Sequence, residues 1–396
     1  MRMAIVTKGE LPVPSVKGGG AETLITALVK ENEKSDNEIT VYSIYDEKAV
    51  EESKKYRNTK FIFLPYRKRT LIDRVRCRLF TDFPRETPIS FSKVASDIKK
   101  KDFDKIVIEH SPWQFPFFVN KFGNKVSLHL HNDWINSSWK GKYANRFREA
   151  INNSAGVITI SKYMESRVMT LGGVDRDKVK LLYNATDIKM FGQALSDFEY
   201  TNIRKQLGIK RSDTVLIYTG RLCQDKGVLE LLEAYKRVSE KNQNIVLLIV
   251  GSVSYGETIT DEYTQKVSEI VKQYPGKIIM TGFVPYKDVY KYYAISDIQI
   301  IPSMWEEPFG LVAIEGMSQG LPIICSDSGG LMEVIDNECG LVVHRDNIIE
   351  ELRDAIDKLV TDKELQKQLG NEAKKRVESH KEYSYSKFYE DFIELL

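Results

Sequence analysis

The sequence predicts an α/β protein built from two doubly wound parallel sheets. Short runs rich in β-branched residues alternate with longer helical stretches throughout the 396 residues. This alternation favours parallel strands joined by right-handed helical crossovers. The chain is also too long for one ordinary hydrophobic core, and a polar stretch from Asn184 to about residue 212 divides it.

The predicted strands form two series, one on each side of the polar stretch. The first comprises residues 2–7, 38–45, 59–65, 104–109, 125–131, 156–160 and 179–183, and the second 214–219, 244–250, 277–281, 297–302, 322–326 and 340–343. We therefore expect a first domain over 1–187 and a second over 188–380. The aromatic-rich tail, 381–396, has helical periodicity and is expected to pack back across the first domain.

Composition is typical of a globular protein of the cytoplasm. Hydrophobic residues make up 42 % of the chain, and no apolar run reaches the ~18 residues that a membrane-spanning helix needs. The opening residues 1–9 predict a buried strand rather than a signal peptide. The four cysteines, Cys77, Cys223, Cys325 and Cys339, form no CxxC pair, which favours a reduced compartment.

The two halves of the chain carry opposite charge. Residues 1–185 hold 33 Lys and Arg against 22 Asp and Glu, and the remainder holds 25 against 34. The densest basic segment, Arg67–Arg78, has apolar residues at roughly helical spacing. It predicts either an interfacial helix on anionic lipid or an ordinary surface segment with solvated charges. A nucleic-acid partner is disfavoured because no stacking platform or recognition motif accompanies the charge.

Two glutamates stand close together in the second domain. The segment 305–315 places Glu307 in a loop after a buried strand and Glu315 inside the following helix. Their separation is predicted to be about 8–12 Å, roughly the distance from the sugar to the ribose of a nucleotide-sugar. Carboxylates accept hydrogen bonds from hydroxyls, and the helix start between them favours a phosphate.

Three more constellations follow predicted strands, at the edge where open α/β sheets bind ligands. Gly18, Gly19 and Gly20 form a loop that either approaches a phosphate closely or is merely flexible. Arg221 and Lys226, between Gly220 and Gly227, are suited to a diphosphate.

His131 ends a further strand and favours a polar role at the ligand. We expect at most one of His129 and His131 to reach the ligand, with the other turned to the opposite face. The single D-x-D sequence, 175–177, favours a solvated turn, and no metal site is expected.

Together these motifs resemble glycosyltransferase family four, the retaining nucleotide-sugar transferases of GT-B fold, over essentially the whole chain. The most specific are Gly220-Arg221 with Lys226-Gly227, and Glu307-Pro308-Phe309-Gly310-Leu311 with Glu315. Supporting matches are Ser161, Asn184 with Asp187, and Ser328-Gly329-Gly330 with Glu333. Ala185 departs from the glycine usual at that position. The GT-B fold implies two Rossmann-like domains facing a central cleft, with 381–396 as the crossover helix.

The resemblance also implies roles for individual residues. His131, Glu307, Arg221 and Lys226 would be the catalytic group. The donor would be held by Gly18, Gly19, Gly20, Arg221, Lys226, Phe283, Val284, Glu307, Phe309, Gly310, Leu311 and Glu315. Among them, Arg221 and Lys226 would bind the diphosphate, Glu315 the ribose, and Glu307 the sugar. The backbone at Phe283 and Val284 would meet the base. Neither a metal nor another cofactor would be required.

The expected activity is transfer of a sugar, with retention, to a glycan or lipid-linked acceptor. The first domain would bind the acceptor and the second the nucleotide-sugar. We expect a UDP-sugar, although backbone contacts to the base leave UDP and GDP open. Two alternatives are a GT-B-fold sugar-nucleotide epimerase, which needs no acceptor, and a non-catalytic partner that binds nucleotide-sugar without turnover. The basic segment suggests a place at the inner face of the cell membrane.

Overall fold

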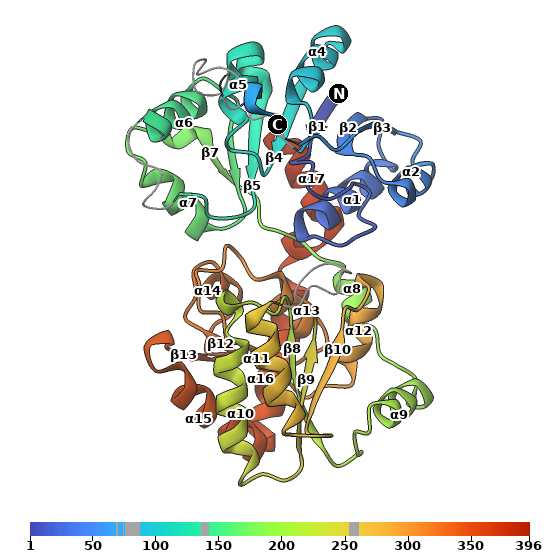
Figure 1. Ribbon diagram of the computed structural model, residues 1–396, viewed down its shortest axis with the longest axis vertical. Coiled ribbons are helices and arrows are strands. Elements are labelled where there is room, and N and C mark those ends of the chain that lie inside the picture. The colour runs from blue at the N-terminus through green and yellow to red at the C-terminus, as the bar shows by residue number, and fades with distance from the viewer. Residues whose placement is uncertain (69, 74, 76–87, 136–141, 253–260) are drawn as a thin grey trace. The chain divides into compact units, whose positions relative to one another are not determined.

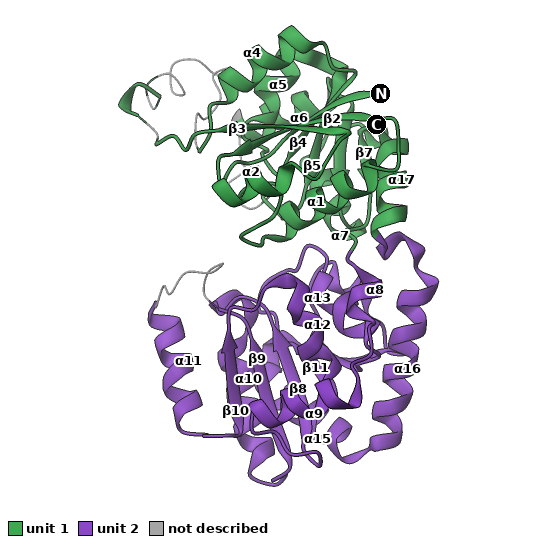
Figure 2. Cartoon of the chain, turned by 90° about the vertical axis from the view of Figure 1, so that its right-hand side faces the viewer, with its two compact units in different colours: residues 1–185, 385–396 green, residues 186–384 purple. Residues whose placement is uncertain are grey.

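The computed structural model describes residues 1–68, 70–73, 75, 88–135, 142–252 and 261–396 (Figure 1). The chain forms two compact units (Figure 2). Unit 1 contains Met1–Ala185 together with Tyr385–Leu396, and unit 2 contains Thr186–Ser384. Each unit has its own parallel sheet, so the predicted pair of doubly wound α/β sheets is confirmed.

Unit 1 has a seven-stranded sheet in the order β3-β2-β1-β4-β5-β6-β7. Its strands are β1 (Arg2–Val6), β2 (Glu38–Ile44), β3 (Thr59–Leu64), β4 (Lys105–Glu109), β5 (Val126–Leu130), β6 (Gly156–Thr159) and β7 (Val179–Leu181). Its helices are α1 (Gly20–Asn32), α2 (Glu47–Ser53), α4 (Phe91–Lys101), α5 (Phe115–Phe122), α6 (Lys142–Asn152), α7 (Lys162–Met169) and α17 (Tyr385–Leu395).

The C-terminal helix belongs to the core of unit 1. Phe388 and Phe392 of α17 are buried in one cluster with Leu24 and Leu28 of α1 and with Met3 of β1. The aromatic spacing of the tail therefore buries one face of the last helix against the first sheet and its first helix. This packing ties the end of the chain to its beginning.

Unit 2 has a six-stranded sheet in the order β10-β9-β8-β11-β12-β13. Its strands are β8 (Thr214–Thr219), β9 (Ile245–Val250), β10 (Ile278–Gly282), β11 (Ile298–Ile301), β12 (Ile323–Ser326) and β13 (Gly340–Val343). Its helices are α8 (Ile188–Phe191), α9 (Asp197–Gln206), α10 (Val228–Ser239), α11 (Glu262–Lys272), α12 (Tyr286–Ala294), α13 (Leu311–Ser318), α14 (Leu331–Val334), α15 (Ile348–Thr361) and α16 (Lys363–Ser379).

Both faces of the second sheet are buried. Along β8, Leu216 and Tyr218 enter one hydrophobic cluster, while Val215 and Ile217 enter another. Successive side chains of a strand point to opposite faces, so the two clusters lie on the two sides of the sheet. A strand buried on both sides needs a continuous apolar run, and this run is the pattern from which the sequence predicts these strands.

The basic segment Arg67–Arg78 is described only in part. Residues 69, 74 and 76–78 lie outside the described residues. In the part that is described, Arg67 pairs with Asp73 at 2.9 Å, and Leu71 and Ile72 are exposed. None of the helices in the described ranges combines the length and the apolar character needed to cross a membrane.

Candidate functional site

In unit 2, the loops after β8, β11 and β12 interlock at one edge of the sheet. Parallel strands bring their carboxyl ends to the same edge, where ligands of open α/β sheets bind. The loop after β8 carries Arg221 and Lys226, and the loop after β11 carries Glu307. The structure thus brings the predicted cations and the first predicted glutamate to one edge.

The strongest link between these loops is an ion pair. The ammonium Nζ of Lys226 lies 2.6 Å from Oε1 of Glu307 and 5.1 Å from the centre of the Trp305 ring. The Ser303 hydroxyl donates to the same carboxylate oxygen. Burial alone would raise the pKa of Glu307, but the charge and hydrogen bond of Lys226 bring that pKa below its ordinary value. Glu307 is therefore held as a carboxylate against a cation.

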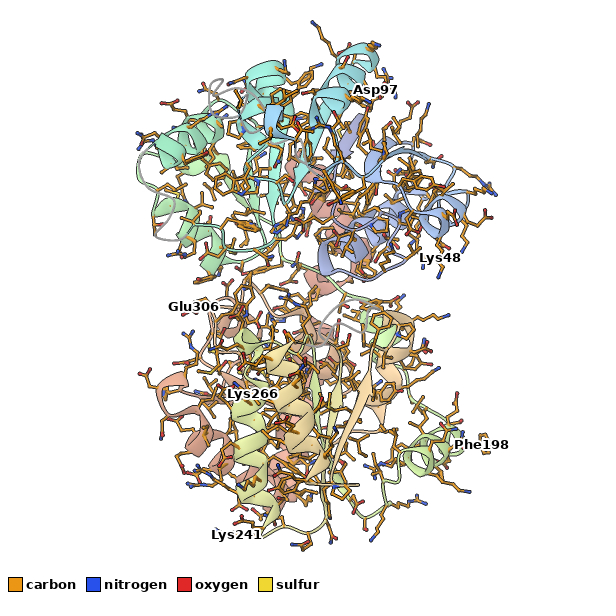
Figure 3. All side chains as sticks on the ribbon, viewed as in Figure 1. Lys48, Asp97, Phe198, Lys241, Lys266 and Glu306 are labelled. Carbon is orange, nitrogen blue, oxygen red and sulfur yellow. The ribbon has the colours of Figure 1, made fainter. Side chains whose placement is uncertain are left out.

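A second set of bonds fixes the backbone around Glu307. Its amide N–H donates to the Ser328 hydroxyl at 2.8 Å, and its carbonyl accepts from the Gly330 N–H at 2.7 Å. The neighbouring Glu306 accepts from the Gly329 N–H at 2.7 Å and pairs with Arg345 at 2.6 Å. Figure 3 marks Glu306 on this loop. The loop after β12 thereby holds the loop after β11 in place.

Gly227 allows the Lys226 loop to approach the next strand. Its φ is +66°, and a Cβ at this position would lie 1.8 Å from the carbonyl oxygen of Pro302. Nearby, the Met304 N–H donates to the Asp225 carbonyl at 2.8 Å. Only glycine combines this left-handed conformation with so close a backbone contact. The glycine in the Lys226-Gly227 motif is therefore required for packing between the two loops.

Arg221 lies at the exposed side of the same loop. Its carbonyl accepts a hydrogen bond from the buried Tyr218 hydroxyl at 2.7 Å, which anchors the backbone. Within the described parts of the chain, its guanidinium makes no ion pair. An anchored backbone with an uncommitted planar cation suits the binding of an anion from solution.

The predicted ribose ligand, Glu315, lies on α13 and is buried. The Tyr293 hydroxyl donates to its Oε2 at 3.1 Å and lies 2.5 Å from Oγ1 of Thr219, the last residue of β8. Burial raises the pKa of Glu315 to about 8, although the Tyr293 hydrogen bond opposes the rise. Near neutral pH, the carboxyl group is thus largely protonated in the free protein.

The other predicted donor contacts of unit 2 lie at the start of α13 and after β10. Gly310, with φ +112°, caps α13, which begins at Leu311. Phe309 turns its side chain inward, 6.0 Å from the Tyr383 ring centre. Phe283 follows β10 and is 45 % exposed, while Val284 packs on the apolar cluster beneath α12. For Phe309, only a backbone role is compatible with this burial.

In unit 1, His131 belongs to a buried polar cluster at the carboxyl ends of β4 and β5. Its Nε2 lies 2.8 Å from Oε2 of Glu109, and the Nδ1 of His129 lies 3.2 Å from the same oxygen. The two imidazole centres are 4.1 Å apart. The expectation that these histidines point to opposite faces was wrong, because residues two apart in a strand share a face.

The glycine loop of unit 1 leads directly into α1. Gly18 and Gly19 have φ of +85° and +101°, and Gly20 is the first residue of the helix. A Cβ at Gly19 would lie 2.2 Å from a carboxylate oxygen of Glu22. Burial raises the pKa of Glu22, and a backbone hydrogen bond and the nearby His131 imidazole oppose that rise. His131 and the start of α1 are therefore electrostatic neighbours.

Three polar residues of these sites were missed from sequence. Tyr293 occurs in an aromatic-rich helix and resembles a core residue, and Ser303 had no distinguishing neighbour. Glu109 could have been noticed, since this acidic residue comes directly after the apolar run 106–108 and before His110. Tyr293 and Glu109 gain significance only from partners 22 residues away in the chain, and Ser303 only from the turn that brings it to Glu307.

Two further features lie apart from the ligand-binding edges. Asp175 and Asp177 are exposed, and Asp175 caps a short 3₁₀ turn. A cavity of about 730 Å³ lies between α4 and α5 of unit 1, at the opposite edge of the sheet from His131.

Possible ligand atoms of Glu109, His129 and His131 lie within 4.8 Å of one another, close enough for a cation, but hydrogen bonds to Glu109 already account for their arrangement.

Comparison with known proteins gives matches along both units. The profile of "Glycosyltransferase Family 4" matches residues 18–189, and that of "Glycosyl transferases group 1" matches residues 199–376. The putative glycosyltransferase YtcC of Bacillus subtilis is 26 % identical over 388 residues, covering 96 % of this chain and 88 % of YtcC. The lipopolysaccharide 1,2-N-acetylglucosaminetransferase of Salmonella typhimurium is 28 % identical over 330 residues, covering 80 % of each chain.

The fold has solved counterparts as well. The crystal structure of Anabaena HepE in complex with UDP-glucose aligns with a TM-score of 0.76 at 18 % identity, covering 100 % of this chain and 98 % of that one. Two parallel Rossmann-like sheets are common to both. With its two halves matched by the two profiles, the chain belongs to glycosyltransferase family 4 and is a retaining glycosyltransferase of GT-B fold that uses nucleotide-sugars.

Proposed function

We propose that this protein transfers a sugar from a UDP-sugar to a glycan or lipid-linked acceptor in the synthesis of cell-surface polysaccharide or glycoconjugate. The observation that carries the donor assignment is the ion pair of Lys226 with Glu307, on the same loop as Arg221, whose guanidinium makes no ion pair with the residues that the structure describes. A diphosphate needs cations, and a sugar needs hydroxyl acceptors. This edge of unit 2 supplies both within hydrogen-bonding distance of each other.

The proposed chemistry is electrostatic. The bond from the anomeric carbon to the diphosphate breaks, and a new bond forms on the same face to an acceptor hydroxyl, whose proton passes to the departing phosphate oxygen. Arg221 and Lys226 stabilise the growing negative charge, and Glu307 contacts the donor sugar. Glu315 accepts hydrogen bonds from the ribose hydroxyls. The backbone at Phe283 and Val284 contacts the base. The backbone amides of Phe309, Gly310 and Leu311 contact the sugar and the phosphate.

Unit 1 is proposed to bind the acceptor. His131 would lie beside the transferred sugar, and the Gly18–Gly20 loop near the phosphate and acceptor. No metal is assigned a step. Two relatives favour a cell-surface product, since one is named a lipopolysaccharide N-acetylglucosaminetransferase and another, 25 % identical over 394 residues, is the spore coat protein SA of Bacillus subtilis.

The test is transfer of radiolabelled sugar from a panel of UDP- and GDP-sugars to membrane and glycan fractions. Product that retains the anomeric configuration supports the proposal. Conversion of the donor without any acceptor would instead indicate an epimerase. Donor binding by calorimetry with no turnover on any acceptor would indicate a non-catalytic partner.

The choice of nucleotide is tested separately by thermal unfolding. A ligand that binds the folded state raises the unfolding temperature by mass action. We expect UDP to raise it more than GDP at equal concentration, in line with the UDP complexes known for the HepE fold neighbour. A larger shift with GDP would overturn the UDP assignment while leaving sugar transfer intact.

We further propose that the basic segment Arg67–Arg78 binds the anionic inner face of the cell membrane. Leu71 and Ile72, exposed by 76 % and 63 %, follow the exposed Lys68 in the chain. Sedimentation with phosphatidylglycerol vesicles at low salt should capture the protein, and L71D/I72D should weaken capture. Phe198, 79 % exposed on α9 and marked in Figure 3, provides the control F198D. Equal capture of the wild type, L71D/I72D and F198D would show that this segment does not bind the membrane.

A further inference from the structure

In unit 1, the single carboxylate of Glu109 contacts the imidazoles of both His129 and His131. In the sheet, Glu109 of β4 pairs in register with His129 of β5, and His131 follows on the same face. Distances to Oε2 of Glu109 are 3.2 Å from Nδ1 of His129 and 2.8 Å from Nε2 of His131. All three side chains are buried.

The carboxylate determines which nitrogen of His131 carries the proton. Burial alone would raise the pKa of Glu109, but His129 and His131 bring it down to about 2, so the group is ionised. An ionised carboxylate only accepts hydrogen bonds, so each imidazole nitrogen facing it must carry hydrogen. His131 is therefore protonated at Nε2.

The other nitrogen of His131 is then an acceptor. Burial and the neighbouring His129 lower the pKa of His131, although Glu109 and Glu22 oppose this, and the imidazole is neutral at pH 7. A neutral ring with hydrogen on Nε2 has a lone pair on Nδ1. Nδ1 has no hydrogen-bond partner among the residues that the structure describes.

His129 is enclosed on its far side. Its ring centre lies 6.3 Å from that of Phe388 and 6.0 Å from that of Phe392, both on α17. Its Nε2 is buried without a hydrogen-bond partner among the described residues. Glu109 is thus its polar anchor, and the aromatic packing leaves His131 as the member of the pair that can meet a ligand.

We propose that Glu109 is a positioning residue that fixes His131 as the Nε2–H tautomer, so that Nδ1 accepts a hydrogen bond from a hydroxyl of the transferred sugar. The contact with sugar rests on the proposed function, whereas the tautomer depends only on unit 1. A neutral acceptor differs from a cationic histidine, which would instead attract the leaving diphosphate. The charged or titratable groups that face His131 are Glu109, His129, Glu22 and His110. The His110 ring centre lies 5.9 Å from that of His131, its Nδ1 accepts from the His131 backbone N–H at 3.3 Å, and Lys8 acts on both Glu22 and His110.

The first test is nitrogen NMR of the full chain labelled with ¹⁵N-histidine at pH 7.5. His131→Asn identifies the His131 signals by their loss. We expect a protonated Nε2 and an unprotonated Nδ1. An Nδ1–H tautomer, an even mixture, or an imidazolium at this pH would overturn the proposal. This readout requires neither donor nor acceptor.

The second test separates positioning from general stability. In Glu109→Gln the amide can donate as well as accept, so both tautomers should become populated and kcat should fall tenfold or more, while KM for the donor changes less than threefold. His129→Asn is the matched control, because its amide can still donate to Glu109 from the position of Nδ1. We expect this control to lose thermal stability but to keep the His131 tautomer.

The pH dependence gives a signature that a merely structural role would lack. Activity that requires neutral His131 falls as pH drops through the His131 pKa. Since the charge of Glu109 favours protonated His131, Glu109→Gln should move this acid limb to lower pH, and His131→Asn should abolish it. An unmoved limb in Glu109→Gln would overturn the proposal. An Nε2–H tautomer in a protein that transfers no sugar would overturn the proposed function and the sugar contact, but not the positioning by Glu109.

Discussion

The ammonium of Lys226 and the carboxylate of Glu307 are 2.6 Å apart, although 81 residues separate them in the chain. Each comes from the loop after a different strand, and β8 and β11 are neighbours in the sheet. The ion pair fixes a cation at the carboxyl edge of the second sheet. A charge fixed in advance needs no reorganisation when negative charge develops on a leaving group.

Replacing Lys226 should damage both turnover and stability. We expect Lys226→Ala to lower the transfer rate by 100-fold or more and to lower the free energy of unfolding by about 2 kcal/mol, because buried Glu307 loses its cation. Lys266→Ala is the matched control, since Lys266 pairs with Glu262 at 2.8 Å on the exposed surface of α11 (Figure 3). Initial rates and urea unfolding measure both effects. Equal rates for the two variants would refute the role of Lys226.

Glu315→Gln should stabilise the protein while weakening nucleotide binding. Because the pKa of Glu315 is raised to about 8, the folded state retains a proton that the unfolded state releases above pH 4.5. Stability from this group is complete below pH 4.5 and declines up to pH 8. The variant should therefore be more stable at pH 7.5 by on the order of 2 kcal/mol, with a flatter stability curve. An unchanged slope between pH 5 and 8 would contradict the assignment.

Nucleotide binding should also release protons. Ribose hydroxyls donate to an ionised carboxylate, so a bound nucleotide should favour ionised Glu315. Calorimetry of UDP binding in two buffers of different ionisation enthalpy measures the protons released. We expect release near pH 7 in the wild type and less release in Glu315→Gln. Equal proton release from both proteins would show that Glu315 does not ionise when the nucleotide binds.

Gly227→Ala should disrupt the interlocked loops. The new Cβ would lie 1.8 Å from the Pro302 carbonyl oxygen, so the backbone of one loop must shift. We expect a loss of about 3 kcal/mol in unfolding free energy and a loss of transfer. Gly208→Ala provides the control, because Gly208 has a similar φ of +71° but no atom within 4 Å of the added Cβ. If the two variants unfold at the same temperature, the contact with Pro302 is not important.

Tyr293→Phe should weaken nucleotide binding, whereas a control variant with the same loss of stability should not. The hydroxyl links Glu315 to Thr219, directly before the Arg221 loop. Tyr235→Phe removes an equally buried hydroxyl that donates to backbone carbonyls at 2.8 and 3.0 Å, away from the site. Each variant should lose about 1 kcal/mol of stability. Only Tyr293→Phe should raise the dissociation constant for UDP, as measured by calorimetry.

Much of the fold was determined by local sequence pattern. Strands such as β8 and β9 are buried on both faces and therefore appear as continuous apolar runs that end in loops. The placement of Lys226 and Glu307 in loops, and of Glu315 in a helix, followed from the same pattern. In a parallel sheet, such loops lie at one edge whatever their distance in sequence.

Tertiary structure alone decided which side chains meet. The pairing of Lys226 with Glu307, the Tyr293 hydroxyl on Glu315, and the Glu109 carboxylate between two histidines depend on strand order and register, which short-range periodicity does not encode. The protonation of Glu315 and His131 also depends on burial, which is a property of the packed chain. The sequence by itself therefore placed these polar groups at the ends of strands and in the following helix, and packing determined their partners and charge.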